Sequence, residues 1–145
     1  MASKDLHNNI HVKRGLSPVA AGTDNTPYVS EIVDTDGYES VEFIILVGAN
    51  TDADATFTTL FEDGDNSALT DNAAVDDKFL LGTEALASFT FADDNKVFKI
   101  GYVGAKRYAR VTITPANNAA GNIYIAGVWL LGHPRSAPTS NPPAA

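Results

Sequence analysis

Apolar side chains recur at every second residue through much of this chain, and this period constrains its fold more than any other feature. Residues 108–114 show the alternation most clearly, because Ala109, Val111 and Ile113 are apolar and the residues between them are polar or charged. A period of two is typical of a β-strand with one buried face. The pattern predicts about eight short strands, within residues 10–14, 28–33, 41–47, 55–61, 79–81, 88–91, 96–103, 108–114 and 122–131.

Two of the predicted strands are apolar on both faces. In residues 41–47 the odd positions are all apolar, and Ile44 and Leu46 on the other face are apolar too. This pattern predicts a strand that is buried on one face and largely covered on the other. In residues 122–131 one face carries Trp129 with isoleucines, and the other is also mostly apolar.

Turn-forming residues separate the predicted strands, and 145 residues suit one domain. The expected fold is therefore all-β, an antiparallel β-sandwich or barrel. Periodicity alone leaves a jelly roll and an immunoglobulin-like sandwich open. The one helical candidate, residues 67–77, has no convincing apolar stripe. Pro115 is expected to end the strand before it, because proline cannot donate to a sheet ladder.

The two ends of the chain differ from its middle in composition. Residues 1–9 are mostly polar and predict an extended N-terminal arm, and residues 10–133 hold the predicted β-sandwich domain. Residues 134–145 contain four prolines among Ser, Thr, Asn and Ala, which predicts a flexible Pro-rich C-terminal tail. Such ends serve assembly in some proteins and are unstructured in others.

Charge is distributed unevenly along the chain. Residues 52–94 contain eleven acidic residues and one basic residue, whereas residues 95–145 contain six basic residues and no acidic one. Two differently charged faces would steer association with a partner. The simpler interpretation is that the acidic residues occupy solvated loops. The net charge of −8 argues against a nucleic-acid partner, because phosphate contacts need a basic surface.

The sequence contains no catalytic signature. Cysteine is absent, and the three histidines lie outside any recognisable nucleophile–base motif. It has neither a phosphate-binding loop nor a nucleophile elbow. His7 and His11 are four residues apart on a segment expected to be extended, where their side chains would not converge on one ion. We therefore expect no enzyme, no cofactor and no metal site.

Two features keep a ligand-binding module open as an alternative. An acidic loop places Asp63 and Asp65 as in an EF-hand calcium loop, but Ala68 and Ala74 replace the required Gly and Glu. An irregular calcium site remains an alternative to a solvated turn at this loop. Trp129 could stack on a sugar, although its apolar neighbours favour burial in the core.

Basic and aromatic residues alternate irregularly between positions 96 and 110. This interleaving could bind single-stranded nucleic acid by stacking, but we expect the aromatic side chains to pack inward while the charges face out. A cationic face that meets an acidic protein surface is a further interpretation. The basic residues of this stretch are Lys96, Lys99, Lys106, Arg107 and Arg110.

Short segments spread over nearly the whole chain, the last ten residues excepted, carry a resemblance to a known family. They are Lys4-Asp5-Leu6-His7-Asn8-Asn9-Ile10, Ser17-Pro18-Val19-Ala20, Gly37-Tyr38-Glu39-Ser40-Val41-Glu42-Phe43, Glu62-Asp63-Gly64-Asp65-Asn66-Ser67-Ala68-Leu69, Leu81-Gly82-Thr83-Glu84, Lys99-Ile100-Gly101-Tyr102, Lys106-Arg107-Tyr108-Ala109-Arg110, Ile113-Thr114-Pro115-Ala116-Asn117 and Leu131-Gly132-His133-Pro134-Arg135. Together they resemble a capsid cement, or decoration, protein encoded among the head genes of tailed bacteriophages. None of the segments is a catalytic signature.

The resemblance implies a jelly-roll-like sandwich that binds the outer surface of an assembled phage head and stabilises contacts between capsomers. It implies the major capsid protein as partner, a homo-oligomer (dimer or trimer), and a place on the virion after assembly in the host cytoplasm, without a membrane. A head–tail connector, a tail protein and a carbohydrate- or calcium-binding module are the alternatives. The polar arm and the charge distribution make the following residues the candidate capsid contacts: Lys4, His7, Asn8, Lys96, Lys99, Lys106, Arg107 and Arg110.

Overall fold

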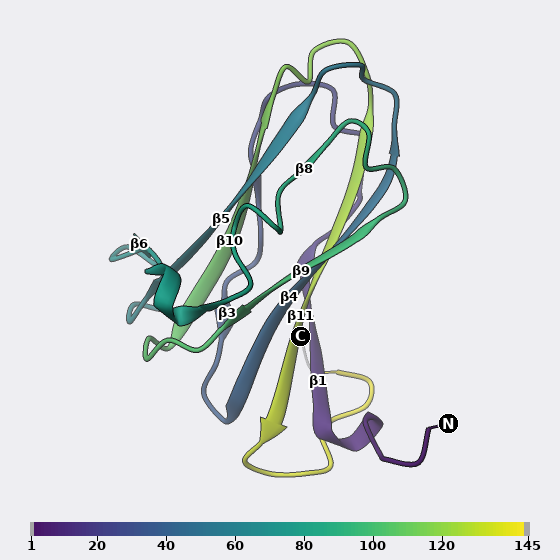
Figure 1. The fold of residues 1–145 in the computed structure, drawn as a ribbon. Coiled ribbons are helices and arrows are strands. Elements are labelled where there is room, and N and C mark those ends of the chain that lie inside the picture. Colours follow the sequence, from purple (N-terminus) through teal and green to yellow (C-terminus); the bar gives the residue numbers. More distant parts are fainter. Residues whose placement is uncertain (1, 144–145) are drawn as a thin grey trace.

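The computed structural model describes residues 2–143, which form two antiparallel β-sheets packed face to face (Figure 1). The sandwich predicted from the period-two pattern is confirmed. In the described part of the chain, helical structure is limited to two short 3-10 turns, η1 (His7–Asn9) and η2 (Asp77–Phe79). None of the described residues forms a helix long and apolar enough to cross a membrane.

Eleven strands make up the two sheets in residues 2–143, and five of them are only two residues long. The first sheet has the order β1 (Ile10–Leu16), β11 (Ile123–Pro134), β4 (Tyr38–Asn50), β9 (Val97–Tyr102) and β7 (Leu80–Leu81). The second sheet is centred on β10 (Tyr108–Ala116) and β5 (Thr56–Gly64), with β2 (Tyr28–Val29) and β3 (Val33–Asp34) beside β10, and β6 (Ala73–Ala74) and β8 (Phe89–Thr90) beside β5.

The strand order is that of a jelly roll, which the periodicity had left open. The first and last strands, β1 and β11, are neighbours in the first sheet, with β4 and β9 following. The strands that come between them in the chain, β2 and β3, β5, and β10, occupy the other sheet. Successive strands therefore cross between the sheets, as in the double Greek key of a jelly roll.

The core consists of the inward residues of both sheets, as the alternation predicted. Ala109, Val111 and Ile113 of β10 are fully buried, and so is Trp129 of β11. The Trp129 ring packs edge-on against Phe43, with 4.6 Å between ring centroids, and its Nε1 donates to the Glu31 carbonyl at 3.0 Å. Each such buried side chain contributes about 1.5–3 kcal/mol to folding.

Two local predictions are wrong. Residues 67–77 form turns and the short strand β6 instead of a helix, because the carboxylate of Asp71 accepts backbone hydrogen bonds from Asp65 and Asn66 and closes a loop. Pro115 does not end its strand, and it pairs with Phe57 of β5. The partner on the other edge of β10 there, β2, reaches only Ile113, so no neighbour on that edge needs the missing N–H.

The two chain ends lie side by side. The backbone N–H of Thr139 donates to the Asn8 carbonyl at 3.0 Å, and its hydroxyl donates to the Ile10 carbonyl. Asn141 also lies within hydrogen-bond distance, 3.3 Å, of His7. These contacts hold the described part of the tail against η1 and the start of β1, so that arm and tail meet at one end of the sandwich (Figure 1).

Candidate interaction surface

The first sheet is apolar on its outer face as well as on its inner face. Because cross-strand neighbours point to the same side, the pairs Ile44↔Val128 and Leu46↔Ala126 place four apolar side chains together on the outside. Val97 of β9 pairs with Leu46 and extends this surface. We call this surface the apolar face; its residues are Ile44, Leu46, Val97, Tyr124, Ala126, Val128 and Leu130.

Much of the apolar face is exposed. Leu46 is 51% exposed, Val97 62% and Tyr124 47%. Contiguous exposed apolar surfaces of this kind are candidate interaction sites. Five of its residues, all but Tyr124 and Leu130, line one shallow depression of about 260 Å³ at its centre.

The second sheet has a different outer face. There Thr58 pairs with Thr114, and Glu62 pairs with Arg110 in an ion pair of 2.9 Å. The two threonines are exposed, as polar side chains on a solvent-facing surface usually are, whereas the Arg110–Glu62 pair is largely covered by its neighbours. The outer face of the first sheet is therefore the more apolar of the two.

The sequence already indicated the apolar face, because residues 41–47 are apolar on both sides of the predicted strand. The prediction, however, was that this second side is largely covered. Apolar residues at both parities of 41–47 predicted a strand covered on both faces. Within residues 2–143 nothing covers the outer side at Leu46, which remains half exposed.

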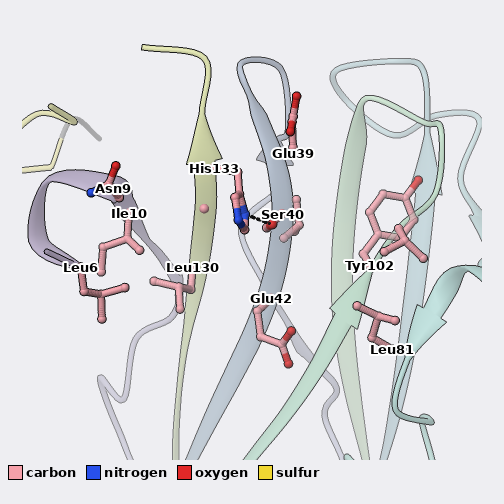
Figure 2. Close-up of a pocket in the computed structure, with 13 residues that line it drawn as sticks. Leu6, Asn9, Ile10, Glu39, Ser40, Glu42, Leu81, Tyr102, Leu130 and His133 are labelled. Atoms are coloured by element: carbon pink, nitrogen blue, oxygen red, sulfur yellow. Dashed lines mark hydrogen bonds between the residues drawn. The ribbon is translucent and has the colours of Figure 1, made fainter. Parts of the chain in front are cut away.

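One end of the first sheet carries a hollow of about 520 Å³ (Figure 2). Its floor is low because Ser40 and Gly132 are small and stand opposite each other on β4 and β11. Apolar side chains of the N-terminal segment stand on one side and those of the β7–β9 region on the other. The hollow is lined by Leu6, Asn9, Ile10, Glu39, Ser40, Val41, Glu42, Leu81, Tyr102, Val103, Leu130, Gly132 and His133.

The carboxylate of Glu42 is the most enclosed charge in the hollow. Its Oε2 lies over Gly101, where a Cβ would approach it to 2.6 Å, so only glycine leaves room for it. Burial raises the pKa of Glu42, and the positive charge of Lys99 offsets part of that rise. In residues 2–143 this carboxylate forms no ion pair within 4 Å, because Lys99 stays farther away.

Ser40 and His133 meet at the edge of the hollow. The Ser40 hydroxyl and Nδ1 of His133 are 2.5 Å apart (Figure 2). His133 is the second-last residue of β11 and has a positive φ of 49°. The contact joins the two central strands where the hollow opens.

The three candidate contacts in the arm lie next to the hollow. Lys4 precedes η1, and His7 and Asn8 are part of it. Asn8 is fixed by Asp5, which accepts hydrogen bonds from its backbone N–H at 3.0 Å and its side chain at 2.7 Å. These hydrogen bonds lower the pKa of Asp5.

The five basic candidates do not form one cationic face. Lys99 lies on the outer side of the first sheet, whereas Arg110 lies on the outer side of the second. Lys96 pairs with Asp93 at 2.8 Å, and Lys106 pairs with Asp65. The acidic and basic segments of the chain therefore neutralise each other in part.

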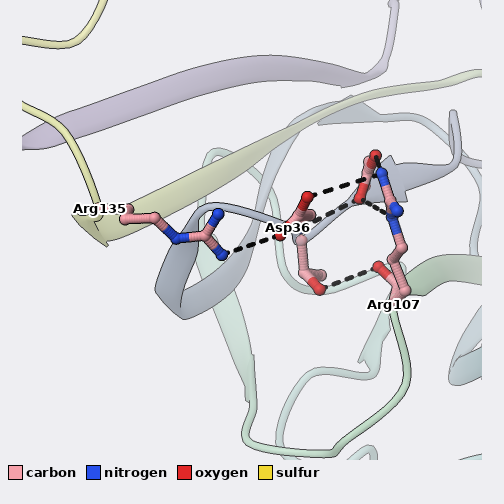
Figure 3. Close-up of polar contacts among 5 residues, drawn as sticks. Asp36, Arg107 and Arg135 are labelled. Atoms are coloured by element: carbon pink, nitrogen blue, oxygen red, sulfur yellow. Dashed lines mark hydrogen bonds and ion pairs between the residues drawn. The ribbon is translucent and has the colours of Figure 1, made fainter.

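Arg107 is the centre of a polar network at one end of the sandwich (Figure 3). Its guanidinium holds Asp34 through two hydrogen bonds and lies 3.8 Å from Asp36, which Arg135 contacts at 3.0 Å. The Arg107 carbonyl accepts from Thr35 at 2.9 Å. These contacts attach the turn between β3 and β4 to the start of β10 and the end of β11.

The acidic loop and the tryptophan are both used within the fold. Asp63 accepts a hydrogen bond from the Tyr102 hydroxyl at 2.7 Å, and Asp65 pairs with Lys106. No group of three or more metal-ligating side chains occurs within residues 2–143. Trp129 is fully buried, as its neighbours predicted, and offers no surface to a sugar.

Comparison with known proteins supports the fold. No family model matches the chain, and no curated protein sequence matches it significantly. The structure is similar to the PBSX exported protein XepA, with a TM-score of 0.51 and 13% identity over 90% of this chain, which spans 39% of the length of XepA. It is also similar to the xylan-binding module CBM15, with a TM-score of 0.41, 10% identity, and coverage of 92% of this chain and 96% of that one.

Proposed function

We propose that the chain is a structural binding protein of a phage particle, a capsid cement protein that attaches to the outside of the head through the apolar face. The observation that carries this proposal is the contrast between the two outer faces. Leu46 and Val97 are exposed on one side, and threonines and paired charges occupy the other. A two-sided sandwich of this kind suits attachment by one side with the other in solvent.

Two further observations support the proposal. The chain resembles cement proteins in segments spread over its length, and XepA, described as a PBSX exported protein, has a similar fold. A protein of this kind acts by binding, and the contacts made by many copies together stabilise the shell. Each copy that spans two capsomers makes its second contact at a high effective concentration, so modest contacts suffice.

We propose that only some of the candidate contacts take part. Lys99 lies on the sheet that carries the apolar face, and Lys4, His7 and Asn8 lie in or before η1, which leads directly into the first strand of that sheet. Lys96, Lys106, Arg107 and Arg110 are engaged with carboxylates of the same chain. We therefore assign the contact to the first sheet and the arm.

Locating the protein in virions tests this function. Virions of the phage that carries the gene are purified and imaged by cryo-electron microscopy, with mass spectrometry to identify the chain. Density on the outer head surface supports a cement protein. Density at the neck would identify a connector, and density at the tail would identify a tail protein. Either result, or absence of the chain from the particle, contradicts the cement function.

Matched variants test the surface. We expect Leu46→Asp and Val97→Asp to weaken binding to purified heads at least about tenfold, because a carboxylate on the apolar face would be buried unpaired. Thr58→Asp and Thr114→Asp place the same charge on the second sheet and should bind as the wild type does. Equal binding by all four variants would contradict an attachment through the apolar face.

A carbohydrate-binding module is the second candidate, because Tyr124 exposes a half-buried ring on the apolar face. An exposed aromatic ring of this kind can stack on a sugar. Titration with xylo-oligosaccharides and a glycan array checks this function. Binding that Tyr124→Ala abolishes would support it over the cement protein.

A further inference from the structure

We propose that the hollow beside the arm is a recognition pocket for an extended segment of the partner protein that presents an apolar side chain and, next to it, a lysine or arginine. The proposal rests on the proposed function, because it specifies the partner's chemistry at the same outer surface. Its evidence is the shape of the hollow and the charge inside it.

The shape suits side chains that enter from outside. A volume of about 520 Å³ is within the range of pockets that hold small ligands, roughly 300–1,000 Å³, and accepts two or three side chains. Leu6 and Ile10 stand on one side, and Leu81 stands on the other (Figure 2). Val103 also lines the hollow. Leu6 is 65% exposed and Leu81 56%, so an occupant that covers these side chains would bury apolar surface on both walls, which favours binding.

The charge in the hollow selects a cation. Glu42 and Glu39 both line it, and the Glu42 carboxylate forms neither a hydrogen bond nor an ion pair within the described chain. An apolar occupant alone would bury this carboxylate without a partner, which is costly. An occupant with a guanidinium or ammonium group would compensate it, and a charge-assisted hydrogen bond is strongest where water is excluded.

None of the lysine and arginine side chains in residues 2–143 lines the hollow. Arg135 follows the strand that forms the floor, but it pairs with Asp36. The tail crosses η1 on the side of His7 and Val12, where Asn141 and Pro143 lie, and leaves the hollow open. Lys99 is on the same sheet but beyond ion-pair distance of Glu42. The occupant that the geometry favours therefore comes from another molecule.

Two features position Glu42 for this role. Gly101 lets the carboxylate lie flat against β9, because a Cβ at that position would come within 2.6 Å of Oε2. Leu130 stands opposite Glu42 on β11 and shields its other side. Gly101→Ala should therefore displace the carboxylate, and it would also crowd Leu81, whose Cβ lies 2.9 Å from the added carbon.

Short peptides test the pocket without a phage head. The full chain, labelled with ¹⁵N, is titrated with acetyl-Leu-Val-Arg-amide, and the same peptide with citrulline in place of arginine serves as the uncharged isostere. We expect the amide signals of Ser40, Glu42, Gly101 and Gly132 to shift with the arginine peptide, with a dissociation constant on the order of 1 mM. The citrulline peptide should bind about tenfold more weakly.

Variants connect this preference to Glu42. Glu42→Gln should lose most of the preference for the arginine peptide, because a neutral amide forms no ion pair with the guanidinium. Asp77→Asn removes one charge from an exposed carboxylate in η2, outside the hollow, and should keep the tenfold preference. Equal affinity of the wild type for both peptides, or signal shifts confined to other regions, would overturn the proposal.

Head binding separates the two proposals. Wild-type protein that binds heads, with Glu42→Gln at least about fivefold weaker and Asp77→Asn unchanged, supports both. If the wild type fails to bind heads but prefers the arginine peptide, the cement function is wrong and the pocket stands. If Glu42→Gln binds heads as the wild type does, the pocket is not a contact with the capsid and the inference is wrong.

Discussion

The guanidinium of Arg107 holds the carboxylate of Asp34 through two hydrogen bonds of 2.9 and 2.8 Å, although 73 residues separate them in the chain. This fork-shaped contact fastens β3 to the start of β10 (Figure 3). Arg107 was a candidate partner contact in the sequence, and in the structure its charge is paired with Asp34 of the same chain.

Arg107→Ala should make stability depend less on pH. The hydrogen bonds from Arg107 hold the pKa of Asp34 below its ordinary value, so the ionised carboxylate stabilises the folded state above the unfolded pKa of about 3.9. That stabilisation is lost as the pH falls through the folded-state pKa. We expect the variant to have a lower urea midpoint than the wild type at pH 7, and the difference to shrink below about pH 4.

Asp34→Asn serves as the matched variant for this pair. It should lower the midpoint at pH 7 in the same way, and the double variant should lose little more, since both changes remove one contact. A difference between Arg107→Ala and the wild type that is the same at pH 3 and pH 7 would contradict the assignment.

Arg110→Ala should destabilise the protein more than Arg14→Ala. The Arg110–Glu62 pair is mostly buried, with side-chain exposures of 23% and 12%, whereas the Arg14–Glu31 pair is 66% and 60% exposed. Removing Arg110 leaves Glu62 enclosed without its partner, at a cost of about 1–3 kcal/mol. Loss of the exposed pair should cost less than about 1 kcal/mol. Chemical unfolding of the two variants checks the order, and the reverse order would contradict it.

Trp129→Phe should lower the free energy of unfolding by about 1–3 kcal/mol, because it removes core volume and one of the two hydrogen bonds that the Glu31 carbonyl accepts, the other coming from the Ser30 hydroxyl. Circular dichroism during urea unfolding measures this change. Tyr124 is an exposed residue on the same strand, on the opposite face from Trp129. Tyr124→Phe should change stability by less than about 0.5 kcal/mol. A similar loss in both variants would argue against the assigned core.

Gly121→Ala should disturb the loop before β11. A Cβ at this position would lie 2.3 Å from the backbone N of Asp52, and backbone cannot move aside cheaply. We expect a loss of about 1–3 kcal/mol. Gly132→Ala is the control, because its nearest neighbour, the Ser40 Cβ at 3.4 Å, is at ordinary contact distance. It should change stability by less than about 1 kcal/mol, as urea unfolding would show.

The inner residues of the long strands could be predicted because burial repeats every two residues along them. Val111 and Trp129 lie in the core, where the alternation placed them. Pro115 and residues 67–77 were mispredicted because their conformation depends on neighbours distant in sequence. Pro115 is tolerated where the edge partner β2 has already ended, and the 67–77 segment follows the cap that Asp71 provides.

The candidate site was predictable only in part. The apolar residues Ile44 and Leu46 were visible in the sequence, but alternation cannot show whether a second apolar face is covered by the same chain or left open. The hollow was not foreseen, because Leu6, Glu42 and Leu81 come from three distant segments. Its shape depends on Gly101 and Gly132. The space that these glycines leave open can be recognised only when the strands are paired in their register.

The sequence by itself determined the fold class of this protein, because a period of two specifies strands with one buried face wherever they pair. It also determined the net charge and which side chains enter the core. Tertiary structure alone decided which charges remain available, since Arg107 meets Asp34 and Lys106 meets Asp65 only when distant strands are brought together. The physical reason is that burial follows a local periodicity, whereas ion pairs, exposed faces and pockets depend on which strands become neighbours.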